Sequence, residues 1–160
     1  MRSSRWASAA LATIALGVLM AACGGGGSPT TPGATCSGSG HSVEVVAELG
    51  SHQVVDRCVN FTGSEIKGLS ALRRSGIEFA SQDSSYGLAI CQIDHEPKSY
   101  TACFPSGQPY WALFLWSAGK GWKSATTGIG EVELKPGQAL GWRYDSSSGK
   151  AAVPPRPPKS

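Results

Sequence analysis

The sequence predicts an α+β domain, a small and mostly antiparallel β-sheet with one covering α-helix in the order β-β-α-β-β-β. Three observations lead to this prediction. Apolar and polar residues alternate in several short segments, which is typical of half-buried strands. Only one segment has apolar residues at helical spacing, and glycine- or proline-containing turns separate the segments. Such a pattern predicts a sheet that a single helix covers, over residues 41–145.

The first two segments predict a β-hairpin. Residues 43–49 alternate, with valine, alanine and leucine on one face and glutamate on the other. Gly50 and Ser51 form a turn signal, and residues 55–61 alternate again. Two alternating runs around a short turn are expected to pair antiparallel.

The helix is expected to follow directly. Residues 62–65 read Thr-Gly-Ser-Glu, the form of a capping box. Ile66, Leu69 and Leu72 then recur every three residues, and Gly76 is placed to end the helix.

Three further strands are expected, over residues 86–93, 110–116 and 140–144, with a short extended piece at 77–80. The segment 110–116 is apolar on both of its faces, which predicts a central strand or one that faces a partner.

These segments, in this order, resemble the transcobalamin-like C-terminal domain, a small β-rich module of vitamin B12 carriers and bacterial envelope proteins. The resemblance covers residues 43–145 and is carried by short sequences. They are Gly-Ser-Glu-Ile at 63–66, Tyr-Gly-Leu-Ala-Ile at 86–90, the aromatic strand at 110–116, Gly-Ile-Gly at 128–130, Leu-Lys-Pro-Gly-Gln at 134–138 and Leu-Gly-Trp-Arg-Tyr at 140–144. In the B12 carriers this module covers one face of the corrinoid, so the resemblance implies a ligand- or partner-binding surface. The chain departs from the family at residues 116–119, where Trp-Ser-Ala-Gly replaces the usual Asn-Gly.

The N-terminus predicts export and lipid attachment. Arg2 and Arg5 precede an apolar stretch, residues 9–22, that is too short to span a bilayer but suits a signal peptide. The following Met-Ala-Ala-Cys at 20–23 resembles a bacterial lipobox, although the family prefers leucine where Met20 stands. We therefore expect a signal peptide over 1–22 and a lipid on Cys23, which would place the protein on the extracytoplasmic face of the cell membrane. The alternative is an ordinary secretory signal that leaves Cys23 as a free thiol.

The remaining four cysteines predict two disulfides, as expected for an oxidising compartment. Four cysteines allow three pairings. We favour Cys91–Cys103, because a short loop turns the chain back between them, and Cys36–Cys58 then follows. A zinc site is disfavoured because the sequence contains no Cys-x-x-Cys pair.

Composition also separates the ends from the fold. Residues 23–40 are Gly/Ser/Thr/Pro-rich and uncharged, which predicts a flexible tether. Residues 146–160 are expected to form a disordered, proline-rich tail. The whole chain has a net charge of +3, whereas residues 41–145 carry 9 basic and 11 acidic residues, a net of −2. A nucleic-acid-binding protein would carry its basic residues on the fold, so no nucleic-acid partner is expected.

Aromatic residues are the candidate binding residues. Five of them stand in the later part of the domain: Tyr110, Trp111, Trp116, Trp122 and Trp142. Exposed tryptophan often marks a contact surface, and a flat tetrapyrrole or a sugar ring would stack on it. Trp111 and Trp116 point to opposite faces of one strand, so we expect one of them inside and at least one of the tryptophans exposed. The alternative is that all four of these tryptophans are core residues.

The sequence contains no recognisable catalytic pattern, so we expect no enzyme, cofactor or metal. His41, His52 and His95 are scattered, and no Gly-x-Ser-x-Gly motif is present. Two functions remain open. One is a membrane-anchored extracytoplasmic module that binds a small ligand, with cobalamin or a related corrinoid as the candidate. The other is a cell-envelope module that binds a protein or the wall.

Overall fold

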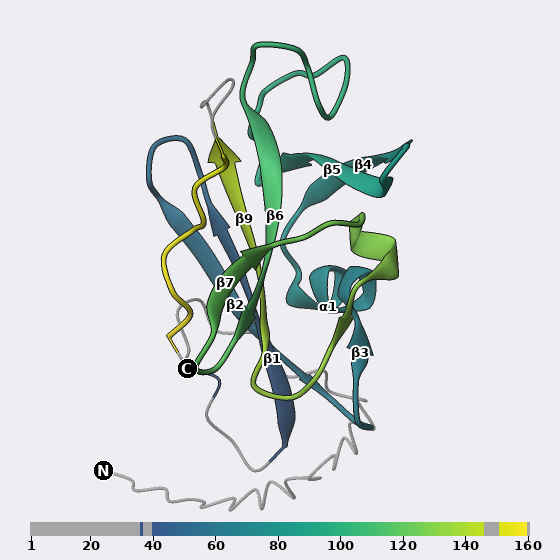
Figure 1. Ribbon diagram of the computed structural model, residues 1–160, viewed down its shortest axis with the longest axis vertical. Coiled ribbons are helices and arrows are strands. Elements are labelled where there is room, and N and C mark those ends of the chain that lie inside the picture. Colours follow the sequence, from purple (N-terminus) through teal and green to yellow (C-terminus); the bar gives the residue numbers. More distant parts are fainter. Residues whose placement is uncertain (1–35, 37–39, 146–150, 160) are drawn as a thin grey trace, which may run out of the picture.

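A five-stranded sheet forms the centre of the computed structural model, which describes Cys36, residues 40–145 and residues 151–159 (Figure 1). Its strand order is β2-β1-β9-β6-β7. β1 pairs antiparallel with β2 and parallel with β9, and β6 pairs antiparallel with both β9 and β7. The strands are β1 (His41–Glu48), β2 (Val54–Phe61), β6 (Tyr110–Ser117), β7 (Gly121–Ser124) and β9 (Ala139–Asp145).

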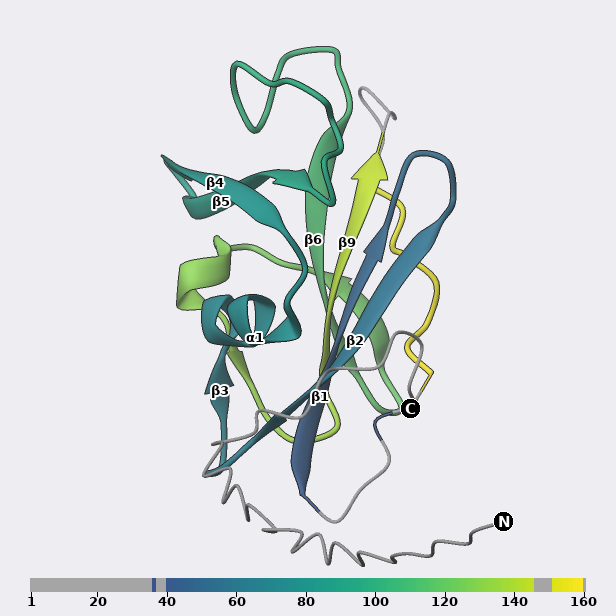
Figure 2. The ribbon, with the colours of Figure 1, turned by 180° about the vertical axis from the view of Figure 1, so that it is seen from behind.

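One face of this sheet is covered by the helix and by short elements (Figures 1 and 2). They are β3 (Ile66–Lys67), α1 (Gly68–Ser75), the β4–β5 hairpin (Phe79–Ser84 and Gly87–Ile93), η1 (Ile129–Glu131) and β8 (Glu133–Leu134). The core lies between these two layers and includes Val45, Leu72, Ile93 and Leu140, all fully buried. The α+β class is therefore confirmed.

The predicted β-β-α-β-β-β order is wrong in detail, because the described residues form nine strands and one α-helix. β3, β7 and β8 have two to four residues each. Such segments are too short to show an alternation in the sequence. Of the predicted piece at 77–80, only residues 79 and 80 are extended as a strand, and they begin the longer strand β4.

The helix begins later than the capping box predicts. Ile66 pairs with Leu134 in the two-stranded β3–β8 ladder, and α1 starts at Gly68 without a side-chain cap. A Cβ on Gly68 would lie 2.8 Å from Ile129 Cδ1, so glycine lets the helix start approach η1 closely. The C-terminal prediction is confirmed, since Gly76 is left-handed with φ of 71°.

The second face of the sheet is also buried, which the alternation of β1 did not predict. Glu44 and Glu48 are only 3% and 7% exposed. Residues 151–159, which we call the C-terminal strap, lie over them (Figure 2). The expected disorder of the tail is wrong for these residues, whereas residues 146–150 and Ser160 lie outside the described residues.

Hydrogen bonds between strap amides and buried carboxylates explain why the strap is ordered. The backbone N–H of Arg156 donates to Glu48 Oε2 at 3.0 Å, and that of Lys159 donates to both oxygens of Glu44 at 3.0 and 3.1 Å. The Lys159 ammonium also lies 2.5 Å from Asp56 Oδ2. Charge-assisted bonds of this kind are stronger than neutral ones. Acidic residues on one strand face, matched by a basic tail, were the sequence signal for this contact.

A glycine makes room for the strap at its centre. A Cβ on Gly141 of β9 would lie 2.7 Å from Pro155 Cγ and 2.5 Å from Trp122 Cη2. Pro155 and the Trp122 indole therefore both rest on the bare backbone of β9. Trp122 also contacts Trp116 edge-to-face, with ring centroids 5.5 Å apart.

The strap leads to a pH prediction at Glu44. Burial is the largest effect on Glu44 and raises its pKa above the ordinary value of 4.5, and the nearby Asp56 carboxylate also raises it. The Lys159 N–H and the positive charges of Lys159 and Arg156 lower this pKa without cancelling the rise. The folded state therefore holds more protons than the unfolded state just above pH 4.5, so this group's contribution to stability falls as pH rises through that window. We expect Glu44→Gln to gain stability relative to the unmodified protein as pH rises from 4 to 7. Urea unfolding of both proteins at several pH values measures this, and a difference that does not change with pH contradicts it.

Both predicted disulfides are present. Cys36–Cys58 joins the start of the described chain to β2, and Cys91–Cys103 joins β5 to the loop before β6, with Cα atoms 5.2 and 4.1 Å apart respectively. Cys23, the tether residues 23–35 and 37–39, and the signal peptide lie outside the described residues.

Candidate functional site: an aromatic pocket beside β6

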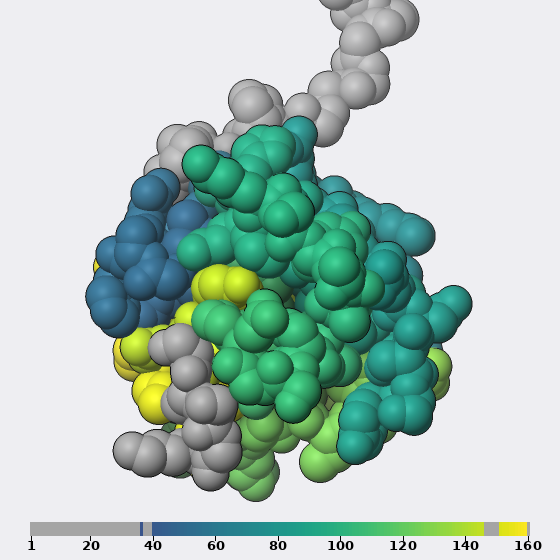
Figure 3. Space-filling model, turned by 90° about the horizontal axis from the view of Figure 1, so that it is seen from above, coloured from purple at the N-terminus to yellow at the C-terminus, as the bar shows by residue number. Residues whose placement is uncertain are grey.

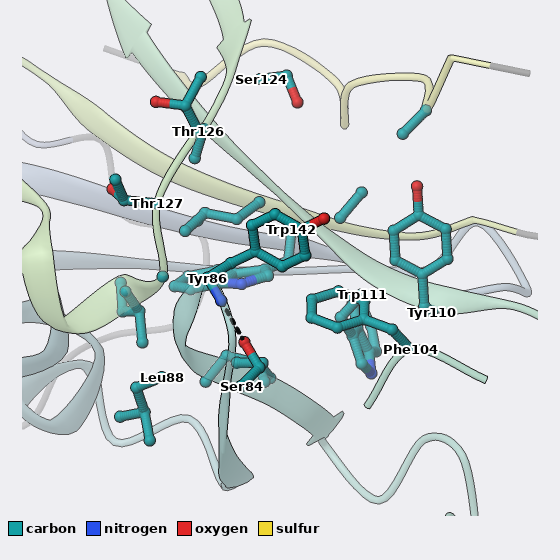
Figure 4. Close-up of a pocket in the computed structure, with 18 of the residues that line it drawn as sticks. Ser84, Tyr86, Leu88, Phe104, Tyr110, Trp111, Ser124, Thr126, Thr127 and Trp142 are labelled. Atoms are coloured by element: carbon teal, nitrogen blue, oxygen red, sulfur yellow. Dashed lines mark hydrogen bonds between the residues drawn. The ribbon is translucent and has the colours of Figure 1, made fainter. Parts of the chain in front are cut away.

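A cavity lies where the chain leaves the sheet after β7. Its volume is about 550 Å³, within the range of small-molecule sites, roughly 300–1,000 Å³. The β4–β5 hairpin, the loop before β6, the first half of β6 and residues 124–128 enclose it (Figure 4). We call it the aromatic pocket.

Five aromatic side chains line this pocket, and three of them, Tyr86, Phe104 and Tyr110, contact one another in a row. Tyr86 is 68% exposed and Phe104 is 47% exposed. Their rings meet edge-to-face with centroids 6.5 Å apart, and Phe104 meets Tyr110 at 5.6 Å. In the described residues only three large hydrophobic side chains are exposed, and the third is Val153. Two of the three therefore gather at one cavity, which favours binding over chance exposure.

Local structure holds Tyr86 at the tip of the β4–β5 hairpin. The Tyr86 N–H donates to Ser84 Oγ at 3.2 Å (Figure 4). The Ser84 hydroxyl donates in turn to the Gly87 carbonyl at 2.7 Å. Gly87 has φ of 92°, a conformation that favours glycine. The Gly128 N–H bonds to the Tyr86 carbonyl, and a Cβ on Gly128 would lie 2.6 Å from Leu88 N. The hairpin tip is thus fixed against the segment that leaves β7.

Phe104 is held by the covalent structure of its loop. It follows Cys103 directly, and Cys103 is bonded to Cys91 of β5. The loop covers this end of the sheet, as the view from above shows (Figure 3). The disulfide therefore limits how far Phe104 can move from the pocket.

Two tryptophans form the inner wall. Trp111 and Trp142 are 2% and 1% exposed, and both line the aromatic pocket. Trp111 Nε1 donates to the Glu96 carbonyl at 2.9 Å, and its ring lies 5.1 Å from that of Tyr144. Burial raises the pKa of Tyr144, and the Glu96 carboxylate raises it further.

The polar lining of the pocket consists of hydroxyls. Ser124 ends β7, Thr126 and Thr127 lie in the segment that leaves it, and Ser84 lies at the hairpin (Figure 4). The lining contains no aspartate, glutamate, lysine, arginine or histidine. A charged ligand group would lose its hydration there without gaining a partner, so this lining favours an uncharged ligand.

The structure divides the five predicted binding residues. Tyr110, Trp111 and Trp142 line the aromatic pocket, whereas Trp116 and Trp122 lie on the opposite face of the sheet, beside the strap. The expectation of an exposed tryptophan is wrong for these four, because Trp116 and Trp122 are half-buried and the other two are buried.

The exposed rings, Tyr86 and Phe104, were not singled out as binding residues by the sequence. The sequence pattern places Tyr86 in a strand, and Phe104 stands alone between turn residues. A signal for Tyr86 was available, since the following glycine at a strand boundary is typical of a turn.

The histidines lie elsewhere and are engaged singly. His52 Nδ1 is 3.2 Å from Glu48, and His95 Nε2 is 2.9 Å from Glu78. His41 contacts the Gly63 carbonyl. Within the described residues no three His, Cys, Asp or Glu side chains gather closely enough to hold a metal ion. No helix in this part of the chain has the length and apolar character needed to cross a membrane.

The fold and the pocket together define a β-rich, disulfide-bonded α+β domain with an uncharged aromatic pocket. Comparisons with known proteins add no family. No model of a known protein family and no curated protein matches the chain. A crystal structure of a "putative metal binding protein" from Ruminococcus gnavus is similar at a TM-score of 0.46 and 14% identity, over 64% of this chain and 94% of that chain. The resemblance to transcobalamin-like domains stays a prediction.

Proposed function

We propose that this protein is an extracytoplasmic binding module, anchored to the membrane by a lipid on Cys23, which captures a small uncharged ligand in the aromatic pocket. The observation that carries the proposal is the pocket itself. It combines exposed rings, buried indoles and hydroxyls, and it contains no charged side chain. Flat apolar ligand faces stack on such rings, and the hydroxyls supply orientation.

A corrinoid such as cobalamin is the candidate that the sequence resemblance supplies. A complete cobalamin is larger than a cavity of about 550 Å³. The pocket would therefore hold one edge of the molecule, between the exposed rings and the hydroxyl wall, and leave the rest in solvent or against a partner.

The test measures binding with and without the exposed rings. Isothermal titration calorimetry with cobalamin, cobinamide and an uncharged porphyrin is the first step. For a ligand that binds, we expect Tyr86→Ala and Phe104→Ala each to weaken binding about tenfold, since a stacked ring contributes roughly 0.5–1.5 kcal/mol beyond its buried area. Both side chains are exposed, so the unfolding midpoint should stay within experimental error of the unmodified protein.

Val153→Ala is the matched control, because Val153 is the third exposed large hydrophobic residue and lies in the strap. It should leave affinity unchanged. Equal affinity in the unmodified protein and in the Tyr86→Ala, Phe104→Ala and Val153→Ala variants would place the ligand outside the aromatic pocket. Failure of every tetrapyrrole to bind would remove the corrinoid candidate.

A further inference from the structure

Part of one wall of the aromatic pocket is an open sheet edge. β7 pairs with β6 only over Phe114–Ser117. The last contact along this edge is the Ala125 N–H, which donates to the Leu113 carbonyl at 2.9 Å. Beyond it the chain turns away toward β5, while β6 continues to Tyr110 with β9 on its other side. Residues 110–113 all line the pocket.

The direction of the backbone groups follows from the strand pattern. In an antiparallel strand, the N–H and C=O of one residue point to the same side, and alternate residues point to opposite sides. The Leu113 carbonyl points away from β9, since it accepts from Ala125. The N–H and C=O of Trp111 therefore also point away from β9, toward the pocket, and among the described strands none pairs with them on that side.

Trp111 is 2% exposed as a whole residue, and no described strand pairs with its N–H and C=O. A backbone donor or acceptor that has no partner is costly where water is largely excluded. A ligand with its own backbone-like donor and acceptor would satisfy both groups. An extended peptide does this, as in the addition of a strand to a sheet edge.

We infer that the aromatic pocket takes a short, uncharged peptide in extended conformation, paired with the β6 edge at Trp111. This inference rests on the proposed function and narrows it by naming the class of ligand. The part of β6 that lines the pocket, residues 110–113, sets the length at about four residues, at about 3.4 Å each. The lining has no charge to match a charged side chain, and the rings of Tyr86, Phe104 and Tyr110 offer contacts for apolar ones.

The test uses acetylated, amidated tetrapeptides built from valine, threonine, alanine and leucine, titrated into the full chain by calorimetry. We expect saturable binding that Tyr86→Ala weakens about tenfold. Because alternate peptide amides would face β6, N-methylation should act in alternation: methylation of an amide that faces the edge abolishes binding, and methylation of the next amide leaves it unchanged. Exchange of one central residue for lysine or glutamate should reduce affinity at least tenfold.

The outcomes separate this inference from the function on which it rests. If a tetrapyrrole binds in a Tyr86-dependent manner and no tetrapeptide does, the pocket is a ligand site and the peptide inference is wrong. If peptides bind but every N-methyl position behaves alike, pairing with the β6 edge is wrong. If no tetrapyrrole and no peptide binds, the proposed function fails as well.

Discussion

A chain that ends at Lys150 should unfold with a free energy about 2–4 kcal/mol below that of the full chain, because hydrogen bonds to charged groups contribute roughly 1.5–3 kcal/mol each and rehydration of the carboxylates offsets part of the loss. The missing strap donates backbone N–H groups to Glu44, Glu48 and Asp145. Urea unfolding measures the difference. A chain that ends at Lys159 is the control, since it keeps all of these donors.

The same truncation should uncover Trp122. Its indole lies beside Pro155 on the bare backbone of Gly141. We expect redder tryptophan emission and stronger quenching by acrylamide in the shortened chain. Equal stability and equal emission in the two truncated chains would show that the strap does not bind the sheet in solution.

A point substitution tests the strap without removing it. Gly141→Ala places a methyl group where Pro155 and Trp122 lie, so either the strap or the indole must move. Gly40→Ala is the matched control, because a Cβ there meets nothing within 4 Å. Only the first variant should show the emission change of the truncated chain.

Removal of the Cys91–Cys103 disulfide should cost stability and ligand binding together. The bond closes a short loop, with a sequence separation of 12, and the chain-entropy relation gives roughly 3 kcal/mol for it. Phe104 also loses its fixed position beside the pocket. For any ligand that binds there, we expect the Cys91→Ala/Cys103→Ala protein to bind at least tenfold more weakly under conditions where it remains folded.

The other disulfide supplies the comparison. Cys36–Cys58 lies on the strap side of the sheet, since Cys58 pairs with Glu44. The Cys36→Ala/Cys58→Ala protein should lose a similar amount of stability and keep its affinity. Equal loss of affinity in both proteins would show that binding depends on global stability and not on the position of Phe104.

Elements with long alternation or a conformational signal could be predicted from the sequence. β1 and β2 alternate over most of their eight residues, β6 is a long apolar run, and Gly76 ends the helix as expected. The helix start could not be predicted, because Ile66 suits both a helical stripe and a buried strand. Its pairing with Leu134 depends on a segment far away in the sequence.

The site was predictable only in part. Alternation placed Trp111 on one face of β6 and Trp116 on the other, but it could not show which face would receive the strap. Trp116 and Pro155 cover part of the Trp122 indole, and Pro155 is far from Trp122 in the sequence. The exposure of Tyr86 and Phe104 depends on a hairpin tip and a disulfide-bonded loop, neither of which has a periodic pattern.

The four tryptophans within residues 41–145 provide the most direct measurement, because two line the aromatic pocket and two lie on the opposite face of the sheet. Their indole N–H signals can be followed by ¹H–¹⁵N NMR during titration with a ligand that binds. The account predicts that the signals of Trp111 and Trp142 shift and those of Trp116 and Trp122 do not. Shifts confined to Trp116 and Trp122 would place the binding surface under the strap and contradict it.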